Sequence, residues 1–424
     1  MTGTTAAAAN KPPSLFGNRF FQTILLSNVL LQIGIWVRNF AILMYVTEKT
    51  NEDPIAISLI YIAEFAPIFI FSFIGGAFAD RWRPKRTMIW CDFLSAGSVL
   101  IVLLALLNGA WQTIFFATLV SAILSQFSQP SAMRMFKSQL PPEQLQQAMA
   151  FFQSLVAIFM VGGPSLGIWA YHQFGIEASV AVMGVAFLLS AVVLFRLPEA
   201  KEEQATTAAA DRSLKRELAE GFRYVWNSPV LKWLGVTFAL AGLAVGIVQA
   251  MGLFVVTEKL GKPKEFLQYM MMINGAAMLV GGGLVAGLAR KVAPQKLLAI
   301  GMLVGAVTNV LIGFSVSVPL TLTLGFIGGL AFPAIHIGIS TMILQWSDPT
   351  NVGRVNGALS PMFVGMMVIM MSISGTLKTV LPLEVIYTIS GVLMFFGMLV
   401  LVPLFKHKPP AEAEMRVESS MPVH

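Results

Sequence analysis

The sequence predicts an all-α membrane protein with twelve transmembrane helices in two pseudo-symmetric six-helix bundles. Of its 424 residues, 56% are hydrophobic and only 12% are charged, and the mean hydropathy is +0.75, which excludes an ordinary soluble globular protein. Twelve apolar segments have roughly the 20 residues that a helix needs to cross a bilayer. The chain also repeats internally, because a shift of 207 residues places Gly76 on Gly283 and Pro142 on Pro349.

The apolar segments group into two halves, separated by the longest polar stretch of the chain. The expected units are a tail, a first bundle, a linker, a second bundle and a second tail, at residues 1–17, 18–197, 198–229, 230–405 and 406–424. The expected spans lie near residues 20–47, 55–79, 87–107, 111–136, 146–171, 178–196, 230–257, 266–289, 297–315, 318–345, 354–377 and 383–405.

Charge predicts how these spans are oriented. With the N-terminus in the cytoplasm, 22 of the 28 Lys and Arg residues fall on the cytoplasmic side and five outside. The positive-inside rule therefore places both termini in the cytoplasm of a cell that carries this protein in its inner or plasma membrane. The net charge of +7 is explained by this orientation and by anionic lipid headgroups, and needs no nucleic acid. No removable signal peptide is expected.

The first span is rich in polar residues. On a helical wheel Asn28, Gln32 and Asn39 share one face, whereas Arg38 lies about 100° away. The second span contains Glu64, which lies at the same depth as Arg38, about 15 Å from the outer ends of the two spans. A lone charge there costs at least about 2.5–3.5 kcal/mol, so the two residues are expected to pair. The amides either line a cavity or join helices, and the pair is either functional or purely structural.

The loop between the second and third spans is strongly basic. Asp80 and Arg81 lie at its membrane boundary, and Lys85 and Arg86 favour the cytoplasm. Asp92, early in the third span, is the expected partner of Arg81 or Arg86. The alternative is a basic membrane anchor with no further role. The fourth span places Ser121, Ser125, Ser128 and Gln129 along one side, with Gln126 off it.

Several patterns resemble catalytic motifs but lack the context that chemistry requires. Residues 163–167 match G-x-S-x-G, yet this serine lies in an apolar helix without a nearby histidine and acid, so a hydrolase elbow is rejected. The glycine run 281–283 follows no strand and is interpreted as helix packing. The single cysteine, Cys91, excludes an intramolecular disulfide and a cysteine-based zinc site. Neither a cofactor nor a metal is expected.

Two further segments have a distinct pattern. In the linker, Leu214, Leu218, Phe222 and Val225 repeat at helical spacing, which predicts an amphipathic helix along the inner membrane surface. In the second half the buried polar groups include Gln249 and His336, beside runs of methionine. Flexible thioethers suit an adaptable cavity, although they also fill ordinary helix interfaces. His336 either titrates near neutral pH or is a satisfied hydrogen bonder.

The basic loop reads G-x-x-x-D-R-x-x-x-K-R, formed by Gly76, Asp80, Arg81, Lys85 and Arg86. It resembles the signature between helices 2 and 3 of the major facilitator superfamily, except that Arg83 stands where the family usually has glycine. The resemblance implies the major facilitator fold and alternating access, with these residues and Asp92 as a gate latch.

Residues Gly163, Pro164 and Gly167 resemble the antiporter motif in helix 5 of the same superfamily, although Phe159 replaces an expected glycine. The segments YVTEKT, LPPEQLQQA and GRVNGALSP, with the basic loop and the linker, resemble the branch of macrolide efflux proteins and enterobactin exporters. That branch implies proton-coupled antiport and efflux of an amphiphilic drug, macrolide-like compound or siderophore. Ser121 stands where many proton-coupled exporters of the superfamily carry an arginine, which departs from their proton relay.

The resulting expectation is a monomeric secondary transporter for a small molecule, with the proton as coupling ion and the lipid bilayer as surroundings. Glu64 and Arg38 are the expected coupling pair. The expected cavity contacts are Asn28, Gln32, Asn39, Gln126, Gln129, Gln249 and His336. An importer of nutrients or lipids on the same fold is the close alternative, because no residue encodes direction. A membrane-embedded enzyme or a channel is a remote one, since the chain supplies neither clustered acids and histidines nor a metal set.

Overall fold

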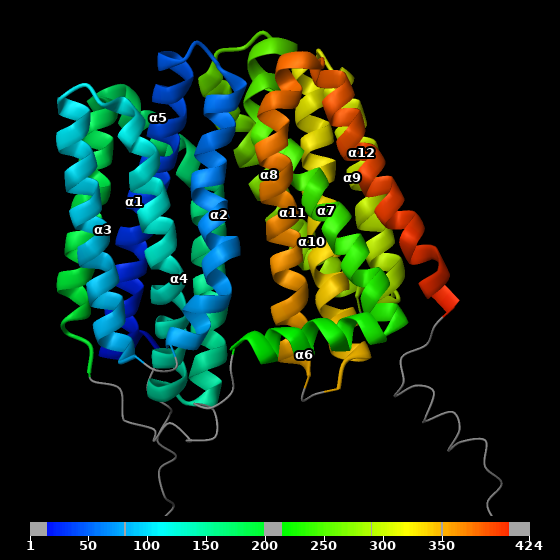
Figure 1. Ribbon diagram of the computed structural model, residues 1–424, viewed down its shortest axis with the longest axis horizontal. Helices are drawn as coiled ribbons and strands as arrows, with labels where there is room; N and C mark the ends of the chain where they lie inside the picture. The colour runs from blue at the N-terminus through cyan, green and yellow to red at the C-terminus, as the bar shows by residue number, and fades with distance from the viewer. Residues whose placement is uncertain (1–14, 80–81, 199–213, 290, 349–350, 407–424) are drawn as a thin grey trace, which may run out of the picture.

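The structure, a computed structural model, describes residues 15–79, 82–198, 214–289, 291–348 and 351–406, and these residues are helical with no strand among them (Figure 1). The first half comprises α1 (Arg19–Lys49), α2 (Pro54–Ala79), α3 (Pro84–Leu107), α4 (Ile114–Gln139) and α5 (Pro142–Leu194). The linker helix is α6 (Leu214–Asn227). The second half comprises α7 (Pro229–Phe254), α8 (Leu267–Leu288), α9 (Pro294–Phe314), α10 (Val318–Trp346), α11 (Val352–Val380) and α12 (Leu383–Leu401).

Helix α5 contains two of the expected spans. Gly175 has φ +77° and ψ −175°, so the chain reverses at one residue between segments 142–174 and 176–194. A side chain at that φ would be strained, which is why glycine serves there. Ten helices are long and apolar enough to cross a membrane by composition alone. The second span of α5 and the serine-rich α4 bring the described spans to twelve, which confirms the predicted fold class.

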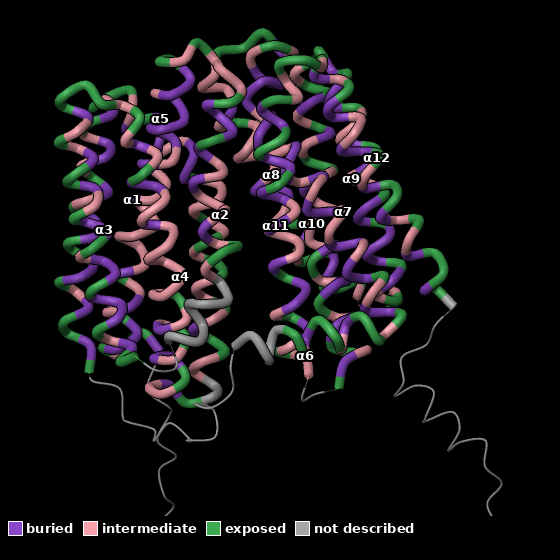
Figure 2. The backbone as a smooth tube through the Cα atoms, in the orientation of Figure 1, coloured by how far each residue is buried: buried purple, intermediate pink, exposed green. Residues whose placement is uncertain are grey.

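The helices form two bundles that stand side by side, with α6 lying across one end (Figure 1). We call the end that holds α6 and both ends of the described chain the basal end, and the opposite end, with the turn from Lys49 to Pro54, the distal end. Buried and exposed positions alternate along the helices of both bundles (Figure 2). Large apolar side chains such as Trp90, Ile101 and Phe396 are exposed. A surface of this kind suits contact with lipid.

Among the residues whose burial is described, the two halves share a core only toward the distal end. There, one buried apolar cluster combines Ile57 of α2 with Ile247 of α7 and Met371 of α11. At the basal end each half has a described cluster of its own, around Phe21 in the first half and Leu231 in the second. The structure therefore joins the halves distally and keeps their basal cores apart.

Gly375 of α11 is essential to the distal contact. A Cβ on Gly375 would lie 2.7 Å from Ser58 Oγ and 2.9 Å from the Pro54 carbonyl of α2. Gly375→Ala is therefore expected to push α2 and α11 apart, at a cost of about 1–3 kcal/mol for the distally closed state. Spin labels at Asn51→Cys and Lys262→Cys, in a Cys91→Ser background, should report longer and broader distances. Gly357→Ala is the matched control on the same helix, because its Cβ meets nothing within 4 Å; equal distances in both variants would contradict the prediction.

The linker helix is docked on the second half. Val225 is buried in the basal core of that half, and a Cβ on Gly221 would lie 2.7 Å from the Arg354 carbonyl. The Tyr224 hydroxyl donates to Asp348 Oδ2 at 3.1 Å and accepts from the Asp348 backbone N–H at 3.2 Å. The predicted helix is thus present, and packing against α11 fixes it in place.

Candidate functional site

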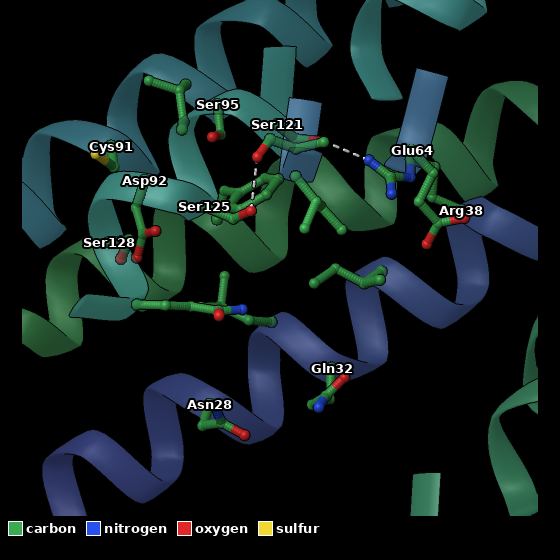
Figure 3. A pocket seen from close by; sticks show the side chains of 17 residues that line it. Asn28, Gln32, Arg38, Glu64, Cys91, Asp92, Ser95, Ser121, Ser125 and Ser128 are labelled. Atoms are coloured by element: carbon green, nitrogen blue, oxygen red, sulfur yellow. Dashed lines mark hydrogen bonds between the residues drawn. The ribbon is translucent and has the colours of Figure 1, made fainter. Parts of the chain in front are cut away.

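A polar cavity of about 230 Å³ lies inside the first half, among α1 to α5 (Figure 3). Its wall carries two acids, one guanidinium, hydroxyls and amides, which is unusual for the interior of a membrane bundle. The polar lining residues are Asn28, Gln32, Arg38, Glu64, Asp92, Ser95, Ser121, Ser125, Ser128 and Gln129.

Arg38 is buried and its guanidinium is held on two sides. Its Nη1 donates to Ser121 Oγ of α4, while Nε and Nη2 donate to Asn39 Oδ1 at 2.9 and 2.6 Å. Arg38 of α1 therefore reaches the fourth span, at the position where the sequence has Ser121. The Ser121 hydroxyl oxygen accepts a hydrogen bond from Arg38.

Glu64 is connected to Arg38 through one amide. Asn39 Nδ2 donates to Glu64 Oε1 at 2.8 Å, and the Oδ1 of the same amide accepts from Arg38. Arg38 and Glu64, both described, do not reach ion-pair distance. The two charges are instead connected through the side-chain amide of Asn39. The matched depth inferred from the sequence holds, but Asn39 acts as the bridge between the two charges. The described hydrogen bond to Glu64 uses Oε1.

Asp92 has a different environment from the one expected. It is 3% exposed, and Ser190 Oγ donates to its Oδ2 at 2.5 Å. Arg86 is exposed and does not contact it, and Arg81 lies outside the described residues. The expected latch contact between Asp92 and Arg86 is therefore replaced by a place in the cavity wall, because Asp92 faces α5 and α1.

The rest of the basic loop is described only in part. Asp80 and Arg81 lie outside the described residues, and Gly76 belongs to the last turns of α2. Lys85 Nζ donates to the Leu197 carbonyl at 2.5 Å, which joins the start of α3 to the turn after α5 within the same half. The latch stays a prediction.

The predicted cavity amides fall in different places. Asn28, Gln32 and Gln129 line the polar cavity, whereas Gln126 donates to Ser125 Oγ at 3.2 Å and lies outside its wall. His336 is exposed and packs between the rings of Phe332 and Phe363, at centroid distances of 5.0 and 5.9 Å. His336 lines neither this cavity nor the second cavity, which lies between the halves.

A second cavity of about 270 Å³ lies between the halves, toward the distal end, and is mainly apolar. Sequence reasoning found one of its polar groups, Gln249, and part of its methionine lining. It missed the aromatic wall, because aromatic residues are common in every span and only tertiary contact selects these. The aromatic residues of this wall are Trp36, Tyr61 and Tyr387, and the other lining residues include Met160, Met270, Met271, Asn274 and Gln249.

The motif in α5 packs the first helix closely. A Cβ on Gly163 would lie 2.3 Å from the Trp36 ring, and one on Gly167 would lie 2.6 Å from the Trp36 carbonyl. These glycines, with Pro164 between them in the same helix, place Trp36 at the edge of the interface cavity. Ser165 donates to Met272 Sδ at 3.1 Å across the halves, so it is a helix contact and not a nucleophile.

Two contacts that the sequence did not reveal join the halves at the distal end, an ion pair and a contact between histidine and glutamate. Lys264 pairs with Glu48, which also accepts from the Tyr171 hydroxyl at 2.7 Å. His172 Nε2 lies 3.4 Å from Glu265 Oε1. Exposed pairs of this kind contribute about 0–1 kcal/mol each, so they add to the distal closure without dominating it. In the described residues no group of three or more His, Cys, Asp or Glu could hold a metal ion.

Comparison with known proteins identifies relatives of the whole chain. The family described as Major Facilitator Superfamily matches residues 24–308 and 247–420. The chain is 24% identical over 359 residues to an uncharacterized MFS-type transporter, YkuC, of Bacillus subtilis (strain 168), covering 82% of this chain and 83% of that protein. It is 26% identical over 332 residues to the multidrug efflux pump Tap of Mycolicibacterium fortuitum, covering 73% and 77%.

Solved structures share the fold at lower identity. The nucleoside transporter NupG superposes with a TM-score of 0.71 at 15% identity, over 92% of this chain and 100% of that one. A bacterial homologue of the iron transporter ferroportin, in its inward-facing state, gives 0.70 at 14% identity, over 92% and 99%.

Proposed function

The chain belongs to the major facilitator superfamily of transporters, and from this premise we propose that it is a proton-coupled exporter of an amphiphilic small molecule. The single observation that carries the proposal is the pair of cavities. One is polar and contains Glu64 linked to Arg38; the other is apolar, lies between the halves and has room for a cargo. A proton site and a cargo site carried by the same helices allow the binding of one to affect the binding of the other.

The interface cavity favours cargo with an apolar, ring-containing body. Trp36, Tyr61 and Tyr387 offer aromatic faces, and the methionines at positions 270 and 271 can adapt to different shapes. Gln249 and Asn274 supply the polar contacts. A mainly apolar wall with few convergent polar groups is typical of small-molecule sites. The multidrug efflux pump Tap among the relatives supports a drug-like cargo.

Proton coupling is proposed for Glu64. Protonation removes the charge that Asn39 and Arg38 hold in place, so the free energy of the bridge changes with the charge of the acid. Arg38 stays charged throughout. Helices α1 and α2 carry the bridge and also line the interface cavity through Trp36 and Tyr61. A movement of these helices when Glu64 is protonated therefore changes the shape of the cargo site.

The distal closure fits one state of an alternating-access cycle. The shared core and the pairs Lys264–Glu48 and His172–Glu265 hold the distal end shut, and the basal cores are separate. With 22 Lys and Arg residues on the basal side and five on the distal side, the positive-inside rule places the basal end and both termini in the cytoplasm. The protein acts as a monomer, since both bundles and both cavities are built within one chain.

An importer on the same fold is the second candidate, favoured by the nucleoside transporter among the structural neighbours. Direction and cargo are tested in the same vesicles. A thermal-shift screen of macrolides, dyes, siderophores, lysolipids and nucleosides first selects a compound that raises the melting temperature of the purified protein.

That compound is then followed in inside-out vesicles with an acidic lumen. An exporter should accumulate it, and collapse of the gradient should stop accumulation. Protease added outside these vesicles should remove a tag placed after His424, which checks the orientation. Accumulation only when the bath, and not the lumen, is acidic would support the importer, and gradient-independent transport would contradict proton coupling.

A further inference from the structure

The two acids of the polar cavity are at different depths and have different partners. Asp92 lies eight residues into α3, about 12 Å from its basal end, whereas Glu64 lies 15 residues from the basal end of α2, about 22 Å. Arg38, Asn39 and Ser121 surround the Glu64 end. Asp92 therefore stands apart from the arginine.

The charges that line this cavity do not balance. Ionised, Glu64 and Asp92 would carry two negative charges against the one positive charge of Arg38, and among the described residues no other cation lines the wall. The guanidinium is already committed to Asn39 and Ser121. Asp92 is 3% exposed and receives a single described hydrogen bond, from Ser190 Oγ. That hydroxyl in turn accepts a hydrogen bond from Ser27 Oγ at 2.7 Å. An ionised carboxylate in such a place is costly unless a positive charge joins it.

Other side chains that carry oxygen line the same cavity at a depth similar to that of Asp92. Asn28, Ser95, Ser128 and Gln129 lie about 14–17 Å from the basal ends of their helices and line the same cavity. The Oδ1 of Asn28 is buried and has no hydrogen-bond partner in the described structure. Figure 3 shows Asp92 and Ser128 on one side of the cavity and Glu64 with Arg38 on the other. Carboxylate, hydroxyl and amide oxygens are the ligands that hard cations prefer.

We infer that Asp92 is the centre of a second cation-binding site, which takes up one positive charge as a sodium ion or a proton. The site uses Asp92 with neutral oxygens of Asn28, Ser95, Ser128 and Gln129. It is separate from the bridge between Arg38 and Glu64, and it concerns ion binding by the folded protein whatever the direction of transport. Besides Asp92, the charged and titratable groups of the cavity wall are Arg38, Glu64 and Cys91.

The test uses purified full-length protein without cargo. Melting temperatures are compared in NaCl and in N-methyl-D-glucamine chloride at equal ionic strength, across a pH series, for the parent chain and Asp92→Asn. If sodium binds, NaCl should raise the melting temperature by about 2 °C or more in the parent and not in Asp92→Asn. Glu64→Gln should keep this response, and Glu177→Gln, an exposed acid of the same half, is the control for loss of charge.

If the site takes a proton, the sodium response is absent and pH carries the signal. The unfolded carboxylate ionises freely as pH rises, whereas the folded one must keep its proton or hold an unbalanced charge. The melting temperature of the parent should then fall, relative to Asp92→Asn, as pH is raised. A parent and Asp92→Asn that respond alike to both sodium and pH would overturn the inference.

Cys91 provides a readout that needs no substitution at Asp92. It is the only cysteine of the chain, precedes Asp92 and lines the same cavity. A bound sodium ion should slow its reaction with N-ethylmaleimide at constant pH, compared with N-methyl-D-glucamine. Measurable labelling at equal rates in the two salts would exclude sodium as the ligand. The response of the melting temperature to pH then tests whether the site takes a proton.

Discussion

Glu64→Gln is expected to abolish the effect of a pH gradient on transport while cargo still binds. Glutamine keeps the shape and the acceptor oxygen that Asn39 Nδ2 contacts, but it cannot take up and release a proton. One pH unit supplies about 1.4 kcal/mol per proton, which corresponds to about tenfold accumulation of cargo. In the variant, accumulation should equal that of vesicles without a gradient, and the thermal shift with cargo should persist.

Glu177→Gln is the matched control, because it makes the same chemical change at an exposed acid of the same half, outside both cavities. It should accumulate cargo as the parent does. Gradient-driven accumulation that survives in Glu64→Gln would move the coupling step elsewhere, to Asp92 or His336.

Arg38→Met is expected to have the largest effect on stability. It removes every described donor that Arg38 gives to Asn39 and Ser121 and leaves Glu64 without its positive neighbour. Breaking a buried ionic arrangement on one side costs about 3–5 kcal/mol, so the variant should melt far below the parent or fail to accumulate in the membrane. Melting temperature and yield of folded protein measure this loss.

The double variant Arg38→Met with Glu64→Leu separates structure from function. With both side chains apolar, no Glu64 carboxylate is left beside a missing Arg38, and folding should recover, because apolar replacements of buried ionic groups are often neutral. Transport driven by the pH gradient should stay absent. Its recovery in the double variant would show that the bridge is structural only.

The sequence by itself determined the membrane class, the twelve spans, the two halves and the amphipathic linker helix. Each of these follows from local hydrophobicity and helical period, which need no knowledge of neighbours. The depth of Arg38 and Glu64 was also readable, because a fixed rise per residue converts position into depth. The turn at Gly175 was expected as a loop of several residues between the spans, because hydropathy does not show that one residue at positive φ can reverse the chain.

Only the tertiary structure decided which side chains meet. The rotation of α1 against α2 and α4 inserts Asn39 between Arg38 and Glu64, and brings Ser121 to Arg38. The rotation of α3 turns Asp92 toward Ser190. Helix rotation and the choice of neighbour depend on the packing of many side chains at once, whereas hydrophobicity records only that a helix is buried. For the same reason the aromatic wall between the halves and the distal ion pairs have no signature in the sequence.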